Sequence, residues 1–295
     1  MTKIYIQEAC PRDGWQNYAT FIPTERKIHY IKSLLECGAK EMEITSFVNP
    51  KVMPQMADAA EVFAAVKPLG QEYGAKFSAL ALNLKGAVRA EEAGADVLSF
   101  VLSASEEHNL RNSHRPLSES MDNFKSLART PRKAEAVLCI ACFFGSPFGD
   151  IITEERMAWL LQEAQSVGIT KFGLADTAGI CNPRHMREVL RFVKELVPVE
   201  NINIHLHDTY GMGIANAYVA LEEGYKHFDA ALAGMGGCPF APGAKGNIAT
   251  EDLVHLCHSL GLETGYDLDM LKAISKNMCQ EFKIRNGSSA TLACR

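Results

Sequence analysis

Two histidines at the end of an apolar run are the residues whose spacing points most directly to chemistry. His205 and His207 lie two positions apart, directly before Asp208. Side chains alternate along a β-strand, so a strand here places both imidazoles on the same side. Imidazole is a common metal ligand, and two of them on one face supply half of a metal site. The alternative is one core histidine with its own hydrogen bond and one surface histidine.

Polar residues of the kinds used in catalysis lie within, at the end of, or after other apolar runs. They are Arg12 and Asp13 after the first run, Glu43 within the second, Asp176 at the end of the sixth, and Cys238 and Asn247 in a glycine-rich segment after the eighth. Each has an ordinary interpretation too: an Arg12–Asp13 surface ion pair, a solvent-facing Glu43 and an inert Cys238 thiol. Together, carboxylate, imidazole and amide ligands with room for water suit Mg²⁺ or Mn²⁺, whereas thiolate or histidine-rich sets favour zinc.

Alternating apolar runs and amphipathic helices must position these residues. The apolar runs are Ile4 to Ala9, Glu41 to Phe47, Phe77 to Leu82, Val97 to Ser103, Ala136 to Phe144, Phe172 to Asp176, Ile202 to His207 and Phe228 to Ala233. Helical patterns occur at Thr24 to Glu36, Gln55 to Val66, Thr153 to Gln165, Pro183 to Val197, Ile214 to Glu223 and, near the end of the chain, Leu268 to Phe282. Glycines stand where helix C-caps are expected, at Gly38, Gly94, Gly168 and Gly224.

Eight strand–helix repeats predict an α/β fold, the (β/α)8 or TIM barrel, which takes about 250 residues to close. Runs buried on both faces and joined by helices indicate parallel pairing. An open doubly wound sheet is the alternative, but no GxGxxG motif follows the first run. We expect a single domain, with the barrel over approximately residues 1–262 and a helical C-terminal extension over 263–295. Catalytic residues of such barrels lie at the carboxyl ends of the strands, so the reactive residues are expected to meet there.

Composition argues against several kinds of partner. The net charge of −5 provides no basic surface for nucleic acid or anionic lipid, so neither nucleic acid nor a membrane is expected as a partner. No signal-peptide pattern opens the sequence, and no apolar stretch reaches the roughly 20 residues that cross a bilayer. Nine scattered cysteines favour free thiols over a disulfide framework. The expected location is therefore the cytoplasm.

Several motifs resemble those of a known family, the 3-hydroxy-3-methylglutaryl-CoA lyases, which belong to the metal-dependent aldolase-type barrels. The resemblance covers nearly the whole chain. It is carried by Pro11-Arg12-Asp13-Gly14, Thr45-Ser46-Phe47-Val48, Asp176-Thr177, His205-Leu206-His207-Asp208-Thr209-Tyr210-Gly211 and the segment from Gly236-Gly237-Cys238-Pro239 to Gly246-Asn247. The Gly-Gly-Cys-Pro sequence is the most specific of these, because it separates the lyases from the related isopropylmalate and homocitrate synthases.

The resemblance implies a retro-Claisen cleavage of 3-hydroxy-3-methylglutaryl-CoA into acetyl-CoA and acetoacetate. It implies a divalent metal held by Asp13, His205, His207 and Asn247. Arg12 would stabilise the enolate, with Arg12 and Gln16 binding the acyl-CoA substrate, and Cys238 would protonate the enolate carbon as a general acid. Three residues match family positions for the base and are not ranked by the sequence: His205, Asp176 and Glu43. The resemblance also implies a homo-oligomer, a dimer or larger.

Trp15 departs from the family pattern, in which leucine is typical, and a bulky indole near the acyl group would reshape the pocket. This keeps open a lyase for another 3-hydroxyacyl-CoA, such as citramalyl-CoA or an isoprenoid-derived glutaryl-CoA. A second alternative is a Claisen-condensing synthase, and a third is an inactive barrel that serves as a scaffold. Retention of the complete set of metal ligands with Arg12 and Cys238 argues against the scaffold.

Overall fold

Eight parallel strands close into a barrel in the computed structural model, which describes residues 2–237 and 246–293. The strands are β1 (Tyr5–Glu8), β2 (Glu41–Ser46), β3 (Lys76–Leu80), β4 (Val97–Ser103), β5 (Glu135–Ala141), β6 (Lys171–Asp176), β7 (Ile202–Leu206) and β8 (His227–Ala230). Each strand pairs with the next in the chain, and β8 pairs with β1. The predicted (β/α)8 barrel is confirmed.

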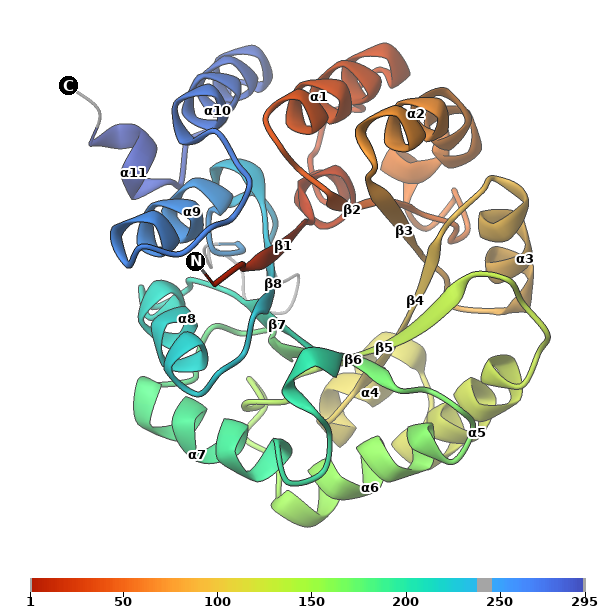
Figure 1. The fold of residues 1–295 in the computed structure, drawn as a ribbon. Helices are drawn as coiled ribbons and strands as arrows, with labels where there is room; N and C mark the ends of the chain where they lie inside the picture. Colours follow the sequence, from red (N-terminus) through yellow and green to blue (C-terminus); the bar gives the residue numbers. More distant parts are fainter. Residues whose placement is uncertain (1, 238–245, 294–295) are drawn as a thin grey trace.

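Helices surround the strands on the outside of the barrel (Figure 1). They are α1 (Thr24–Glu36), α2 (Ala59–Tyr73), α3 (Leu84–Glu92), α4 (Glu106–Ser113), α5 (Leu117–Ala128), α6 (Glu154–Gln165), α7 (Pro183–Val193), α8 (Gly213–Glu222), α9 (Thr250–Ser259), α10 (Leu268–Phe282) and α11 (Ser289–Leu292). The helices cover the outer face of the sheet and the inner face lines the interior of the closed barrel, which explains why the strands read as apolar runs.

Local sequence signals set most helix boundaries. Gly38, Gly94, Gly168 and Gly224 all have positive φ at helix ends, as their predicted C-cap role requires. Helix α2 was expected from Gln55 but begins at Ala59, because a separate 3₁₀ turn occupies Pro54–Met56. It then runs beyond Val66 to Tyr73 and ends at a left-handed glycine.

Strands β5 and β8 each end three residues before their apolar runs do. Strand β5 ends at Ala141 rather than Phe144, because Cys142 adopts a φ of 55° that breaks the extended conformation. Strand β8 ends at Ala230, and a short 3₁₀ turn over Leu232–Gly234 follows it. Both irregular segments lie at the carboxyl end of the barrel, where loops rather than strands present side chains.

The two C-terminal helices pack on the side of the barrel. Helix α10 contacts α1 and α9 (Figure 1). The Tyr18 hydroxyl donates a hydrogen bond of 2.6 Å to the carbonyl oxygen of Phe282, and Arg26 forms an ion pair with Glu281. Within the described part of the chain, none of the helices combines the length and apolar character needed to cross a membrane.

Candidate active site

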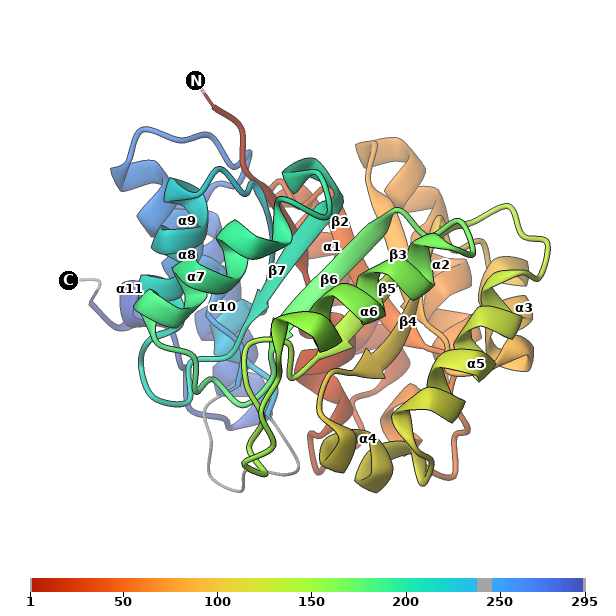
Figure 2. The same ribbon diagram turned by 90° about the horizontal axis from the view of Figure 1, so that it is seen from below.

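The predicted reactive residues that the structure describes lie at or near the carboxyl ends of the strands. Arg12 and Asp13 occupy a π-helical turn, Cys10–Gly14, directly after β1. His205 lies near the end of β7, and His207 directly follows that strand. Figure 2 shows the barrel from the side, with α4 beyond the carboxyl end of β4 at the lower edge.

Three potential metal ligands meet at this end of the barrel. One ligand atom each from Asp13, His205 and His207 lies within 4.8 Å of the others. The two imidazole rings have centroids 5.2 Å apart, so the expected same-side placement of the histidines is confirmed. Ligand atoms this close could bind one ion together.

Backbone pairing brings Asn247 to the same place. The amide of Asp208 donates to the carbonyl of Gly246 at 3.0 Å, and the amide of Ile248 donates to that of Leu206 at 2.9 Å. Asn247 therefore lies opposite His207 in an antiparallel bridge. Its Nδ2 donates to Asp13 Oδ2 at 2.7 Å, which leaves its Oδ1 as the ligand atom.

A glycine makes this approach possible. Gly236 has a φ of +118°, and a Cβ atom built on it would lie 2.5 Å from Asn247 Nδ2 and 3.1 Å from Asp13 Oδ2. A larger residue here would be strained and would collide with two of the four predicted ligands. The glycine-rich character of this segment thus has a structural reason beside the metal site.

Two polar atoms of the cluster are buried without a partner. Asn247 Oδ1 and His207 Nδ1 have no hydrogen-bond partner among the described residues. Such groups are costly unless a ligand satisfies them. Burial, together with the neighbouring His205, lowers the pKa of His207 to about 4, so its ring is neutral and able to ligate. The donor set of carboxylate, imidazole and amide oxygen fits a divalent ion.

Arg12 is held between two carboxylates. Its Nη1 is 2.7 Å from Asp13 Oδ1, and both its Nε and Nη2 lie 2.5 Å from Glu43 Oε2. Burial lowers the pKa of Arg12, but the charges of Glu43 and Asp13 outweigh it and raise the pKa above its ordinary value. Glu43 is only 3% exposed, so the solvent-facing interpretation is wrong. Gln16 Nε2 donates to Asp13 Oδ1 at 2.7 Å, which places Gln16 beside the metal ligands.

The three candidate bases differ in their surroundings. Glu43 is bound to Arg12, as described. Asp176 is fully buried and accepts hydrogen bonds of 3.1 Å from the amides of Ile180 and Cys181. Burial raises the pKa of Asp176 to about 6, although these amides oppose the shift. His205 Nδ1 lies 3.0 Å from Asp229 Oδ2, so only its Nε2 is left for a metal.

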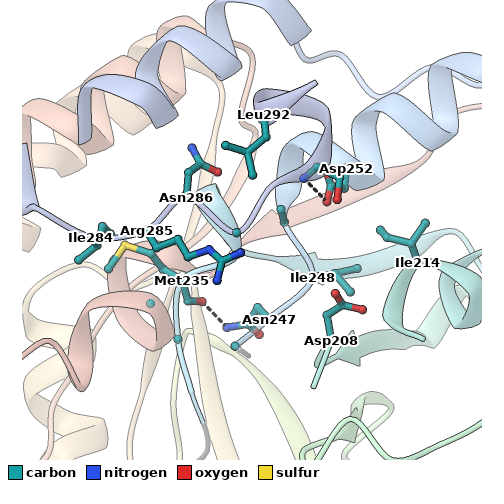
Figure 3. Close-up of a pocket in the computed structure, with 18 of the residues that line it drawn as sticks. Asp208, Ile214, Met235, Asn247, Ile248, Asp252, Ile284, Arg285, Asn286 and Leu292 are labelled. Atoms are coloured by element: carbon teal, nitrogen blue, oxygen red, sulfur yellow. Dashed lines mark hydrogen bonds between the residues drawn. The ribbon is translucent and has the colours of Figure 1, made fainter. Parts of the chain in front are cut away.

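Two residues of the site were missed from the sequence. Asp229 lies on β8 directly opposite His205, and the pairing register of β7 and β8 was the signal that could have found it. Arg285 lies in the C-terminal extension, where no motif marked it. It extends into a cavity of about 440 Å³ that is also lined by Gly236, Asn247 and Asn286 (Figure 3).

The other two residues singled out from the sequence are placed differently. Cys238 lies outside the described residues. Trp15 is 0% exposed, belongs to the hydrophobic core and is not among the described residues that line this cavity. Its indole therefore packs in the hydrophobic core and not on the wall of this cavity.

The fold and the site together define a barrel enzyme with a candidate metal centre at the carboxyl ends of its strands. A family model described as HMGL-like matches residues 3–278, and the chain belongs to this family.

Named relatives cover nearly the whole chain. It is 38% identical to the mitochondrial hydroxymethylglutaryl-CoA lyase of Gallus gallus, over 99% of this chain and 98% of the relative. It is 36% identical to the 3-hydroxy-3-isohexenylglutaryl-CoA/hydroxymethylglutaryl-CoA lyase of Pseudomonas aeruginosa, over 99% and 97%. Among solved structures, an HMG-CoA lyase from Acinetobacter baumannii in complex with coenzyme A and 3-methylmalate superposes with a TM-score of 0.93 at 38% identity, covering 99% of this chain and 95% of that one.

Proposed function

We propose that this protein is a carbon–carbon lyase that cleaves 3-hydroxy-3-methylglutaryl-CoA into acetyl-CoA and acetoacetate. The observation that carries the proposal is the convergence of Asp13, His205 and His207 beside the buried cation of Arg12. A retro-Claisen cleavage needs a deprotonated hydroxyl and a stabilised enolate. A metal held by the cluster would favour loss of the hydroxyl proton, and the cation of Arg12 would stabilise the enolate. The names of relatives that align over nearly the full length support the same reaction.

The metal site in this proposal consists of Asp13, His205, His207 and the Oδ1 of Asn247. These residues would hold a divalent ion, Mg²⁺ or Mn²⁺, which would supply Lewis-acid activation and lower the pKa of the substrate hydroxyl. Two atoms of this set, Asn247 Oδ1 and His207 Nδ1, are buried without a hydrogen-bond partner among the described residues. Buried polar atoms of this kind are costly unless a ligand satisfies them, which supports the assignment.

Arg12 stabilises the negative charge of the enolate in this proposal. A guanidinium stays charged and can donate two parallel hydrogen bonds to the thioester oxygen where charge develops. Glu43 and Asp13 hold the side chain in place, so little reorganisation is needed during the reaction. Gln16, bound to Asp13 on the neighbouring turn, lies where it can contact the same end of the substrate.

The proton movements require a base and an acid. The base takes the hydroxyl proton, the carbon–carbon bond breaks as the alkoxide becomes a ketone, and the enolate carbon of acetyl-CoA then gains a proton. We assign the base to a carboxylate, Asp176 or Glu43, because the contact of His205 Nδ1 with Asp229 leaves only Nε2, which would hold the metal. The family resemblance supports Cys238 as the acid.

The acyl-CoA substrate fits the cavity beside the metal ligands. Arg285 brings a positive charge into this cavity, which suits the phosphate groups of coenzyme A. Backbone groups of Gly236 and Gly246 line the wall nearest Asn247. The thioester would then lie toward the barrel and the nucleotide toward the C-terminal extension.

Acetyl-CoA release tests the substrate. The purified protein is assayed with Mg²⁺ or Mn²⁺ on 3-hydroxy-3-methylglutaryl-CoA and on citramalyl-CoA, with chelator controls. Release from the first substrate is expected, because a relative that aligns over nearly the full length is named for it. Release from citramalyl-CoA alone would assign the same chemistry to a different substrate.

Assembly and location are part of the proposal as well. We propose a homo-oligomer, a dimer or larger, in the cytoplasm. The described cysteines are free thiols, which suits a reducing compartment. Light scattering after size-exclusion chromatography measures the assembly and would overturn it by giving the monomer mass of 32.4 kDa. Cell fractionation tests the location.

A further inference from the structure

We propose that Asp229 is a positioning residue that orients His205 and determines which of its ring nitrogens is left for the metal. The inference rests on the metal site proposed above. Asp229 lies on β8, in register with His205 on the neighbouring strand β7. Its Oδ2 is 3.0 Å from His205 Nδ1, and its side chain is buried.

The chemistry of the pair assigns the proton. A carboxylate oxygen accepts hydrogen bonds, so the contact with Asp229 Oδ2 assigns the hydrogen to Nδ1 of His205. The lone pair of the neutral ring then lies on Nε2, which points away from Asp229. A hydrogen bond of this kind also fixes the rotation of the ring before a metal arrives.

The second oxygen of Asp229 is fixed from the opposite side. Its Oδ1 accepts hydrogen bonds from Gln7 Nε2 at 2.9 Å and from Asn203 Nδ2 at 2.5 Å. Gln7 is itself oriented, because its Oε1 accepts a hydrogen bond of 3.1 Å from the Ser78 hydroxyl. Both oxygens of the carboxylate therefore have assigned partners, and only one of them faces His205.

The side chains of Gln7, Ser78 and Asn203 form a polar layer inside the barrel, on the side of the strand starts relative to the metal ligands. Gln7, Ser78 and Asn203 line a cavity of about 110 Å³ whose other walls include the first residues of several strands. Asp229 thus connects the polar interior of the barrel to the ligand cluster. Asp229 contacts the metal ligand His205 and not the reacting atoms, so its role is to position His205.

The hydrogen bonds around Asp229 predict the effect of an isosteric substitution at this position. In Asp229→Asn, the donors Gln7 and Asn203 would keep the carbonyl oxygen of the new amide on their side. Its NH₂ group would then face His205 Nδ1 and require an acceptor there. The ring proton would move to Nε2, the nitrogen needed for the metal.

Mn²⁺ binding to the metal-depleted protein tests this directly. Free Mn²⁺ is measured by electron paramagnetic resonance for the wild type, Asp229→Asn, Asp229→Ala and the control Asp122→Asn. Loss of a partner of this kind typically weakens metal affinity about 10- to 100-fold, and we expect this for both Asp229 variants. Asp122→Asn makes the same isosteric change at an exposed position of α5, so it should bind Mn²⁺ nearly as the wild type does.

The outcomes separate this inference from the proposed function. A thermal melt first establishes that each variant is folded at the assay temperature. A purely structural Asp229 would lower the melting temperature and leave the Kd for Mn²⁺ unchanged, which would overturn the inference while the metal site stands. Failure of the wild type to bind Mn²⁺ would overturn both.

A measurement on the wild type needs no substitution at Asp229. In ¹⁵N-histidine-labelled, Mg²⁺-loaded protein, the two ring nitrogens of His205 can be distinguished by NMR, with the signals assigned through a His205→Asn sample. We expect the proton on Nδ1. A proton on Nε2 would overturn the inference even if the Asp229 variants fail to fold.

Discussion

At the residue scale, Arg12, His205 and Asp176 are each held by partners that fix their positions in the site. Arg12 is clamped by Glu43 and Asp13, and His205 by Asp229. Asp176 is held differently, by backbone amides of the turn that follows it. Preorganised groups need little rearrangement during the reaction, which is where such sites gain most of their rate.

Asp176 gives a prediction about the pH dependence of the rate. A base must be ionised, and burial raises the pKa of Asp176 to about 6. If Asp176 is the base, kcat/KM of the wild type falls as the pH drops through about 6, and Asp176→Asn loses about 10²- to 10⁴-fold in kcat together with this acidic limb. A pH profile of acetyl-CoA release measures both. If Asp176→Asn kept the wild-type kcat and the acidic limb of the pH profile, Glu43 would be left as the base.

At the element scale, two irregular segments bring the ligands together. One is the π-helical turn after β1, which carries Asp13, and the other is the segment 246–248, which pairs with the end of β7. Their contact near Gly236 leaves no room for a Cβ atom. The metal site therefore depends on backbone conformation as much as on the ligands.

Two adjacent glycines allow a matched test of this dependence. Gly236→Ala should weaken Mn²⁺ binding by about tenfold or more, because the strained backbone and the new methyl group displace Asn247. Gly237→Ala is the control, since a Cβ there meets no described atom within 4 Å. Calorimetric titration with Mn²⁺ compares the two. Equal affinities would show that the glycine at 236 is not required.

The C-terminal extension contributes Arg285 to the cavity. Arg285→Ala should raise KM for the acyl-CoA by about 10-fold with little change in kcat, because a phosphate contact is made equally in the ground and transition states. Arg285→Lys keeps the charge and should recover part of the loss. Steady-state kinetics on both variants measure this. A fall in kcat at constant KM would place Arg285 in the chemical step instead.

The elements were predictable from the sequence to different degrees. The bounds of α1 and α10 follow from periodicity and flanking residues, and the same-side histidines from strand alternation. The early end of β5 was not predictable, because a positive φ at a cysteine has no sequence signature. Asn247 could be placed only through the family resemblance, since its approach to His207 depends on pairing between distant segments.

At the scale of the whole molecule, two buried glutamates connect the barrel to its C-terminal part. Glu8 accepts hydrogen bonds from the amides of Cys10 and Leu232 and from the Thr250 hydroxyl. Glu251 accepts from the amide of Ala233 and from Thr291 on α11. Burial raises the pKa of each carboxyl to about 7.

Glu8 makes the stability of the fold depend on pH. Its pKa is 4.5 in an unfolded reference and about 7 in the folded protein. Its contribution is therefore fully present below pH 4.5 and is lost as the pH rises toward 7, because only the unfolded chain releases the proton in this range. Glu8→Gln keeps the hydrogen bonds and removes this dependence.

Urea unfolding at several pH values checks the prediction. Relative to the wild type, Glu8→Gln should gain up to about 3 kcal/mol in free energy of unfolding between pH 4.5 and 7. Glu25→Gln on the exposed surface is the control and should show no such gain. A difference between Glu8→Gln and the wild type that does not change with pH would contradict the assignment of a raised pKa to Glu8.

The central claim is metal-dependent cleavage, and one titration tests it most directly. Acetyl-CoA release from 3-hydroxy-3-methylglutaryl-CoA is measured on the metal-depleted protein while Mn²⁺ is added stepwise. We expect no release at the start and a rise that saturates at one ion per chain, because one cluster of Asp13, His205 and His207 is present in the described structure. Full activity in excess chelator, before any Mn²⁺ is added, would contradict the account.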